Sequence, residues 1–307
     1  MTSLPSAGSA PHLFCFGLGY SAATLAERLL QEGWRVSGTC RSESKRQALA
    51  GRGIRAMIFD RDRPLPAAEQ ALATVTDLLS SVPPDAFGDP VLDHHGTDIA
   101  AMAGMRWIGY LSTTGVYGDT GGAAVDESAP VNPSSERGHR RVVSEQAWLS
   151  LHRAHGLPVH IFRLAGIYGP GRSTLDQVLS GSARRIDRPG HVFSRIHVVD
   201  IATILRASMA RPEPGTLYNV CDDEPAEPRA VVEYACRLLH REPPPLMPFE
   251  QAAPLMSPMA QSFWRDNRRV VNRRVKQALD IRLAFPNYRA GLDALAREYF
   301  DVAADRP

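Results

Sequence analysis

The 307-residue sequence has few of the features that mark secreted, metal-binding or membrane-spanning proteins. Its only four cysteines stand at positions 15, 40, 221 and 236, without a Cys-x-x-Cys pair and without a histidine at zinc-binding spacing. We therefore expect reduced, structural cysteines, no metal site and a cytoplasmic protein. No run of about 18 apolar residues is present, which excludes a membrane-spanning helix.

The chain also lacks a charge excess and a leader-like start. Its formal net charge is +2, so composition gives no argument for a nucleic acid or a membrane surface as partner. Residues 1–11 have neither the basic start nor the apolar core of a secretion signal, and we expect a flexible tail. The hydrophobic share of 44% is typical of a globular protein with a buried core.

Short apolar runs alternate with helical patterns in the first half of the chain, which predicts a parallel sheet covered on both faces. Six such strands indicate a doubly wound α/β fold, a Rossmann domain over residues 12–165. Proline clusters separate shorter elements beyond residue 165, so we expect 166–307 to form mainly a smaller α/β substrate lobe, interleaved with a sheet completed near 196–222. The expected strands are 12–16, 35–39, 54–59, 75–80, 107–112 and 159–163.

Two helices are predicted by apolar spacing. The first covers 21–32 and ends at Gly33. The second covers 136–154, in a register that turns Val142, Ala147 and Leu151 inward. The run 265–276 holds six basic residues against one aspartate, as either a solvated helix face or a phosphate-contacting edge of a substrate site.

A glycine loop between the first strand and the first helix is typical of dinucleotide-binding proteins. It reads Gly17-Leu-Gly19-Tyr20-Ser21-Ala22. Gly17 permits the tight turn, Gly19 lets the backbone approach a diphosphate, and Ala22 is small enough for close helix–strand packing. The free amides and the dipole at the helix start would hold the diphosphate. Alone the motif is weak, because glycine turns are common.

The end of the second strand favours NADP over NAD. An NAD site places an acidic residue about 20 residues past the glycines, but this region reads Gly38-Thr-Cys-Arg41-Ser42. Arg41, Ser42 and Lys45 are expected to bind a 2′-phosphate; alternatively, Arg41 is a surface arginine at the start of a loop. Asp60, which closes the third strand, would either bind the adenine amino group or cap the strand.

Ser80 and Ser81 follow the fourth strand, whose carboxyl end is expected to face the cofactor. The prolines at 83 and 84 stiffen this loop. The two hydroxyls would either bond a ribose or serve ordinary turn chemistry.

Several separated stretches resemble the extended short-chain dehydrogenase/reductases, the NAD-dependent epimerase/dehydratase family. Their common order along residues 12–300 is far more specific than any one motif. They are the glycine loop, Leu-Ser-Thr-Thr-Gly-Val-Tyr-Gly at 111–118, Arg-Leu-Ala-Gly-Ile-Tyr-Gly-Pro-Gly at 163–171, Arg-Ile-His-Val-Val-Asp-Ile at 195–201 and Leu-Tyr-Asn-Val at 217–220.

The resemblance implies roles for several of these residues. Thr113 would polarise the substrate carbonyl, or its hydroxyl would only satisfy the end of the strand. The loop with Tyr168, Gly169 and Pro170 would lie near the nicotinamide. His197 and Asp200 would be structural, tying the second lobe to the sheet. Extended members often pair through a helix bundle, so the resemblance also implies a homodimer formed by the helix at 136–154.

One departure from the family concerns the catalytic helix. The family expects Tyr-x-x-x-Lys, with a glutamate four residues beyond the lysine. Anchoring on Glu145 puts Arg137 at the tyrosine position and Arg141 at the lysine position, and no tyrosine lies between Tyr117 and Tyr168. Arginine stays protonated and cannot exchange a proton. The sequence therefore resembles the atypical extended branch, which lacks the pair.

Losing a positioned general acid or base typically costs about 10²–10⁴ in rate. Three other arrangements would compensate for the missing general acid or base. Tyr117 would donate the proton, or simply pack; His139 would act as the acid, since histidine titrates near neutrality, or simply be solvated. Arg137 or Arg141 would stabilise an oxyanion without moving a proton, or contact the cofactor.

Two functions remain. The first is an NAD(P)-dependent oxidoreductase or epimerase-like enzyme acting on a small polar substrate, with a nucleotide sugar implied by the resemblance. The alternative is a non-catalytic NADP-binding sensor or regulatory protein, favoured by the missing pair. Nucleic-acid binding is disfavoured because no aromatic residues are interleaved with the basic run.

Overall fold

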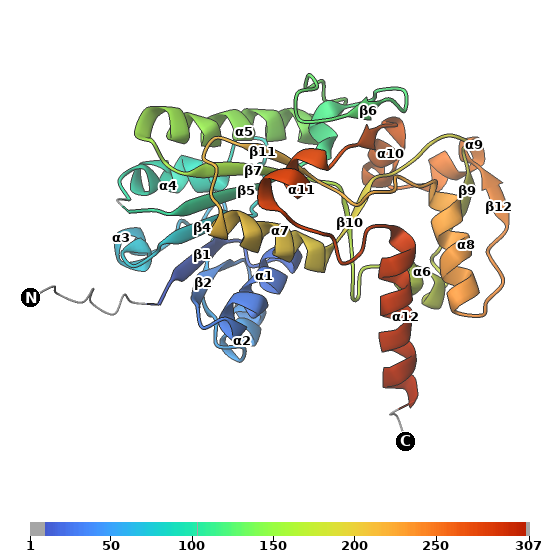
Figure 1. The fold of residues 1–307 in the computed structure, drawn as a ribbon, viewed down its shortest axis with the longest axis horizontal. Helices are drawn as coiled ribbons and strands as arrows, with labels where there is room; N and C mark the ends of the chain where they lie inside the picture. Colours follow the sequence, from blue (N-terminus) through green and yellow to red (C-terminus); the bar gives the residue numbers. More distant parts are fainter. Residues whose placement is uncertain (1–9, 103, 305–307) are drawn as a thin grey trace, which may run out of the picture. The chain divides into compact units, whose positions relative to one another are not determined.

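The computed structural model describes residues 10–102 and 104–304, without the side chains of 302–304. Its main sheet has seven strands in the order β11-β7-β5-β4-β1-β2-β3 (Figure 1). The pairs of β1 with β2 and β4, β2 with β3, and β4 with β5 are all parallel. The strands are β1 His12–Phe16, β2 Arg35–Cys40, β3 Arg55–Ile58, β4 Asp77–Ser80, β5 Trp107–Thr113, β7 Val159–Leu164 and β11 Leu217–Val220.

The predicted doubly wound sheet is confirmed: each of the six expected strands is present, and β11 adds the later segment. Helices α1 (Tyr20–Gln31) and α2 (Glu43–Ala50) lie on one face of the sheet, and α4 (Pro90–Ala100) and α5 (Glu136–His155) on the other (Figure 1). The short helix α3 (Ala68–Leu72) precedes β4. The expected tail, residues 1–11, lies outside the described residues apart from its last two.

Helix α1 forms as its sequence predicts. Ala22, Leu25, Ala26 and Leu29 are buried at helical spacing, and Gly33 follows the helix with a φ of +80°. That left-handed conformation favours glycine. Its buried face places the start of α1 at the carboxyl end of β1.

The predicted register of the second helix is wrong for one residue. In α5 Ala147 is exposed, and Val142 and Leu151 are only half-buried. The buried face holds Ser144, Glu145, Trp148 and Leu149 instead. Three of these carry polar groups, and two have partners across the unit: the Trp148 Nε1 donates to Asp89 (2.9 Å) and Glu145 accepts from Ser112 (2.5 Å). Counting apolar residues alone therefore misassigned the buried face.

The chain divides into two compact units. The first holds the described residues up to Ser112 with 143–161 and 205–216; the second holds 113–142, 162–204 and the described residues from Leu217 on. This division differs from the expected boundary at residue 165, since each unit is assembled from separated segments.

The second unit contains three two-stranded parallel sheets: β8 (Gly166–Tyr168) with β10 (Arg195–His197), β9 (Arg185–Asp187) with β12 (Leu246–Pro248), and β6 (Ala124–Val125) with β13 (Arg269–Val270). An apolar cluster joins α6 (Thr174–Leu179), α8 (Pro228–Leu238) and α12 (Tyr288–Ala304). The remaining helices of this part of the chain are η1 (Thr114–Tyr117), α7 (Val198–Ala210), α9 (Phe249–Ala252), η2 (Ala253–Leu255), α10 (Pro258–Arg265) and α11 (Arg273–Leu279).

The basic run 265–276 is not one helix face. It spans the end of α10, a loop, β13 and most of α11, so its cations point to different partners. Arg268 contacts Asp266, Arg274 lies near Glu127, and Lys276 pairs with Asp223.

All four cysteines are buried, as predicted. Burial raises the pKa of each thiol, most strongly for Cys15 and Cys221. Within residues 10–102 and 104–304, no helix combines the length and apolar character needed to cross a bilayer.

Candidate functional site

The glycine loop of the first unit is held from two sides. The Gly17 amide donates to Thr39 Oγ1 (2.9 Å), and the next amide, of Leu18, donates to the Thr39 carbonyl (2.7 Å). From the other side, the Ser81 hydroxyl donates to the Gly17 carbonyl. The ends of β2 and β4 therefore fix the loop before any ligand arrives.

The two glycines of the loop have different physical roles. Gly17 has a φ of +85°, and an added Cβ would lie 3.0 Å from Ser81 Oγ. Gly19 has an ordinary φ of −80° and is exposed, and an added Cβ would meet nothing within 4 Å. Glycine is thus needed at position 17 for the fold. At position 19 the absence of a side chain only keeps the space above the loop open.

The start of α1 faces that space with unpaired donors. Gly19 is the N-cap residue, and the first intrahelical bond runs from Ala23 N to Gly19 O (2.8 Å). The amides of Ser21 and Ala22 precede that bond and have no carbonyl within the helix to reach. No acidic side chain lies in the first turn, so the arrangement suits a diphosphate.

Ser80 and Ser81 are placed differently. Ser81 supports the loop through the bond to Gly17. Ser80 is fully buried, and its hydroxyl oxygen has no partner within the described part of the chain. Ser81 therefore supports the loop, whereas the Ser80 hydroxyl is enclosed below the surface.

Arg41 and Ser42 lie at the end of β2, where a 2′-phosphate was expected. Ser42 caps α2 by accepting from Lys45 N (3.3 Å). The exposed Arg41 guanidinium makes no hydrogen bond to any residue that the structure describes; its carbonyl accepts from Arg63 Nη2 (3.1 Å). Arg63 was missed from the sequence, although it follows the neighbouring strand β3.

Asp60 is engaged by that same arginine. Arg63 donates to its carboxylate through Nε (2.9 Å) and Nη2. These hydrogen bonds from Arg63 lower the pKa of Asp60. The carboxylate therefore closes a turn between residues 60 and 63 and holds the Arg63 guanidinium near the end of β2.

In the second unit, Thr113 is the last residue of β5, and Gly115 follows two residues later. Thr113 Oγ1 accepts from Gly115 N (3.1 Å). The hydroxyl hydrogen has no acceptor among residues 10–102 and 104–304, so it is available to a carbonyl oxygen. An added Cβ on Gly115 would lie 3.3 Å from Thr113 Oγ1 and 4.0 Å from Arg268 Nη2.

Tyr117 is packed inside the second unit, with both hydrogen-bonding functions of its hydroxyl in use. It donates to Asn219 Oδ1 (2.8 Å) and accepts from Arg163 Nη1 (3.0 Å), whose guanidinium also stacks on the ring. Burial raises the pKa of this phenol, partly offset by Arg163. The geometry favours the packing role left open above.

The first two turns of α5 carry the residues aligned with the family's tyrosine and lysine. Arg137 is exposed and its guanidinium lies 6.0 Å from the centre of the Phe263 ring; Arg141 is half-buried and His139 exposed. Gly138 allows close packing, since an added Cβ would lie 2.6 Å from Pro133. This turn and the Thr113 loop therefore lie against each other, with the Gly115 carbonyl 3.1 Å from the same Cβ position.

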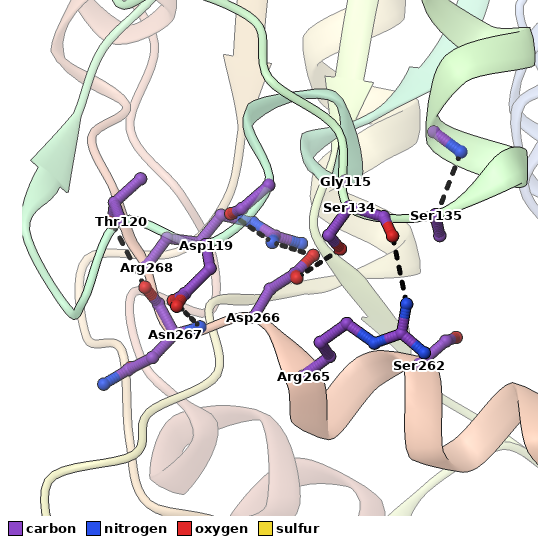
Figure 2. Close-up of polar contacts among 12 residues, drawn as sticks. Gly115, Asp119, Thr120, Ser134, Ser135, Ser262, Arg265, Asp266, Asn267 and Arg268 are labelled. Atoms are coloured by element: carbon purple, nitrogen blue, oxygen red, sulfur yellow. Dashed lines mark hydrogen bonds and ion pairs between the residues drawn. The ribbon is translucent and has the colours of Figure 1, made fainter.

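A polar network joins this turn to the loop after α10 (Figure 2). Asp266 accepts from the Ser134 hydroxyl, and Arg265 donates to the Ser134 carbonyl (3.0 Å). Arg268 Nη1 donates both to Asp266 Oδ2 (2.8 Å) and to the Gly118 carbonyl (2.9 Å). Asn267 N donates to Asp119 (2.8 Å). No spacing of residues along the chain predicts this contact between distant segments.

The later motifs have buried positions in the second unit. Tyr168 is buried, and Gly169 and Arg172 exchange two backbone hydrogen bonds that close the loop at exposed Pro170. Asp200 accepts from the amides of residues 284 and 285. Burial lowers the pKa of His197 to about 4, and its ring packs 4.0 Å from that of Phe285. These contacts agree with structural roles for His197 and Asp200.

Comparison with known proteins decides the family. A model of the NAD dependent epimerase/dehydratase family matches residues 17–221. The chain belongs to this family.

Three similar proteins illustrate the comparison, two by sequence and one by fold. Protein YeeZ of Escherichia coli is 30% identical over 240 residues, covering 74% of this chain and 84% of YeeZ. A functionally unknown conserved protein from Silicibacter pomeroyi is 48% identical, with a TM-score of 0.86 over 94% of this chain and 99% of that one. A UDP-glucuronic acid 4-epimerase from Bacillus cereus, in complex with UDP-glucuronic acid and NAD, has a TM-score of 0.76 at 14% identity, over 95% and 99% of the chains. At that identity the likeness shows the fold alone.

Proposed function

We propose that this epimerase/dehydratase family member is an NADP(H)-dependent oxidoreductase or epimerase-like enzyme that acts on a small polar substrate. The observation that carries the proposal is Gly19: it is exposed, it has open space above it, and it caps a helix in which the amides of Ser21 and Ala22 precede the first intrahelical hydrogen bond. The residues present thus fit a dinucleotide diphosphate.

The preference for NADP is argued from charge. Arg41 has no carboxylate partner in the described chain, and Arg63 is anchored beside it through Asp60. Two guanidinium groups at the ends of β2 and β3 suit a 2′-phosphate, and no acidic residue at the end of β2 is placed to bind ribose hydroxyls. Ser42 would add its hydroxyl, while Ser81 holds the loop.

The substrate chemistry is assigned to the second unit. A bound nicotinamide supplies hydride transfer. Thr113 would donate its free hydroxyl hydrogen to the substrate carbonyl oxygen, and Arg137, at the position of the family's tyrosine, would stabilise negative charge there without moving a proton. Tyr117 receives no proton-transfer role in this proposal, because Asn219 and Arg163 occupy its hydroxyl.

A nucleotide sugar is one substrate of this kind, since UDP-glucuronic acid is named with the Bacillus cereus neighbour. The test is NADPH oxidation against a panel of carbonyl compounds that includes nucleotide sugars with a 4-keto group. Slow turnover is expected, because a missing general acid or base costs about 10²–10⁴ in rate. Tight NADPH binding with no turnover on any compound would favour the NADP sensor.

We also propose the cytoplasm as compartment, and a homodimer formed through α5. The dimer is supported by an exposed apolar pair one helical turn apart, Val143 (66% exposed) and Ala147. Light scattering on the wild type and on Val143→Glu tests it: a dimer that the substitution converts to a monomer supports the proposal, and a wild-type monomer contradicts it.

A further inference from the structure

Arg268 has an unused donor edge beside the residues proposed for chemistry. Its side chain is only 16% exposed, yet both of its hydrogen bonds leave from one nitrogen, Nη1. The Nε and Nη2 groups donate to nothing in the described part of the chain. Neither nitrogen is among the buried polar atoms that lack a partner in this part of the chain, so the edge reaches solvent and is accessible to a ligand.

The same edge is occupied in other arginines of this protein. Arg61 donates hydrogen bonds to both carboxylate oxygens of Asp85, from Nε (2.8 Å) and Nη2 (2.9 Å). Arg46 grips Glu43 in the same way, at 2.8 and 2.5 Å. Two parallel N–H donors match the two oxygens of a carboxylate or a phosphate. In Arg268 this pair of donors is free.

Gly115 brings this edge close to the Thr113 hydroxyl. The Cβ position of Gly115 lies 4.0 Å from Arg268 Nη2 and 3.3 Å from Thr113 Oγ1, so a side chain at 115 would crowd the hydroxyl, and glycine lets the two donors lie on the same side of the loop. The Thr113 hydroxyl hydrogen is also unused within that part of the structure. A molecule with two acceptor groups a few bonds apart would satisfy both donors.

The nearby carboxylates are engaged by other donors. Arg265 donates to the Ser134 carbonyl and Arg137 lies near Phe263, while the Asp119 carboxylate accepts from the amides of residues 121 and 267 and that of Asp266 pairs with Arg268. That carboxylate is 7% exposed and fixes the guanidinium through Nη1, leaving the opposite edge pre-oriented (Figure 2).

From these contacts we propose that Arg268 binds an oxyanionic group of the substrate, a carboxylate or a phosphate carried close to the carbonyl or hydroxyl that Thr113 contacts. This inference rests on the proposed function and narrows its substrate class to small anionic hydroxyl or carbonyl compounds. Arg268 would act in binding and positioning, through its Nε and Nη2 edge.

The test is an NMR titration of the full-length protein with malonate and, separately, with inorganic phosphate. The expected result is a shift of the Gly115 amide and of the Arg268 Nε–Hε signal. Arg268→Lys keeps the charge that balances Asp266 but loses the two-donor edge, and should weaken the response about tenfold or more. Arg269→Lys is the matched control: Arg269 is an exposed neighbour of Arg268, and the variant protein should bind both probes like the wild type.

The outcomes separate the sources and the two proposals. A response to malonate alone identifies a carboxylate, and a response to phosphate alone identifies a phosphate; either supports the inference. Equal responses in wild type and Arg268→Lys, or no shift at Gly115 with either probe, would overturn it. NADP is titrated in the same samples, so a failure of dinucleotide binding is scored on the Gly19 amide, independently of Arg268.

Discussion

The amide of Gly17 donates a 2.9 Å hydrogen bond to the hydroxyl oxygen of Thr39, so the glycine loop is tied to the second strand of the sheet. The carbonyl of the same glycine accepts from Ser81. A loop fixed on both sides needs little reorganisation when a ligand binds, which lowers the free-energy cost of binding.

Substitution of Gly19 should separate binding from folding. Gly19→Val places a branched side chain in open space at an ordinary φ, so the thermal midpoint should change little while dinucleotide binding is lost. Gly17→Ala is the contrasting variant: its φ of +85° costs about 1–2 kcal/mol for an L residue and should lower the midpoint by a few degrees. Calorimetric binding and thermal unfolding of both variants check this, and retained affinity in Gly19→Val would refute the site.

Arg41 should control the choice between NADP and NAD. Arg41→Gln removes charge-assisted hydrogen bonds to a 2′-phosphate, so NADP affinity should fall about 10–100-fold and NAD affinity should not. Arg46→Gln is the control, because Arg46 is also exposed but pairs with Glu43. Dissociation constants for both dinucleotides give the answer. Equal weakening of NADP and NAD would mean that Arg41 does not read the 2′-phosphate.

Thr113 should matter for turnover through its hydroxyl. Thr113→Val keeps the shape but removes the donor, and loss of one such donor typically lowers kcat about 10²–10³-fold. Thr113→Ser retains the hydroxyl and should keep most of the activity. Steady-state rates with NADPH and a substrate from the carbonyl panel measure both. Unchanged kcat in Thr113→Val would remove Thr113 from the chemistry.

Buried His160 should make the protein less stable in acid. Its Nε2 accepts from Glu213 N (2.9 Å) and its Nδ1 lies 3.2 Å from the Ile108 carbonyl, which suits the neutral ring. Burial lowers its pKa from 6.5 to about 4. Between pH 6.5 and about 4 the unfolded chain therefore binds a proton at His160 and the folded chain does not. The free energy of unfolding is highest above pH 6.5 and falls as the pH drops toward 4.

We expect His160 to lower the free energy of unfolding by about 2 kcal/mol when the pH falls to about 5. His191 and His197 are shifted in the same direction by burial, so His160→Gln should reduce the pH dependence without removing it. Urea unfolding at about pH 5 and about pH 7.5 measures the slope, which is the change in the free energy of unfolding with pH. A variant whose slope matches that of the wild type would contradict the assignment.

Much of the sheet could be predicted because its signals are local. Buried parallel strands are continuous apolar runs, and the positive φ of Gly17 and Gly33 is a property of single residues. The face of α5 could not be predicted, since Glu145 and Trp148 are buried through hydrogen bonds to Ser112 and Asp89. Those partners are distant in sequence and leave no periodic signal.

The candidate site divides in the same way. Arg41 was identified because it follows a recognisable strand, and Thr113 because its motif resembles that of the family. Arg63 was missed, and Arg268 was indicated only as one cation of the run 265–276, because each depends on a tertiary contact: Arg63 with the carbonyl of Arg41, and Arg268 with that of Gly118. The pairing of Arg268 with Asp266, two residues away, is local, but its approach to Gly115 comes only from the fold.

Calorimetric titration of the purified protein with NADP, NADPH, NAD and NADH tests the central claim most directly. The account predicts binding of the two phosphorylated forms, weaker binding of the other two, and loss of all four in Gly19→Val. If none of the four binds to the wild-type protein, the dinucleotide site is wrong, and the glycine loop is only a tight turn in a Rossmann sheet.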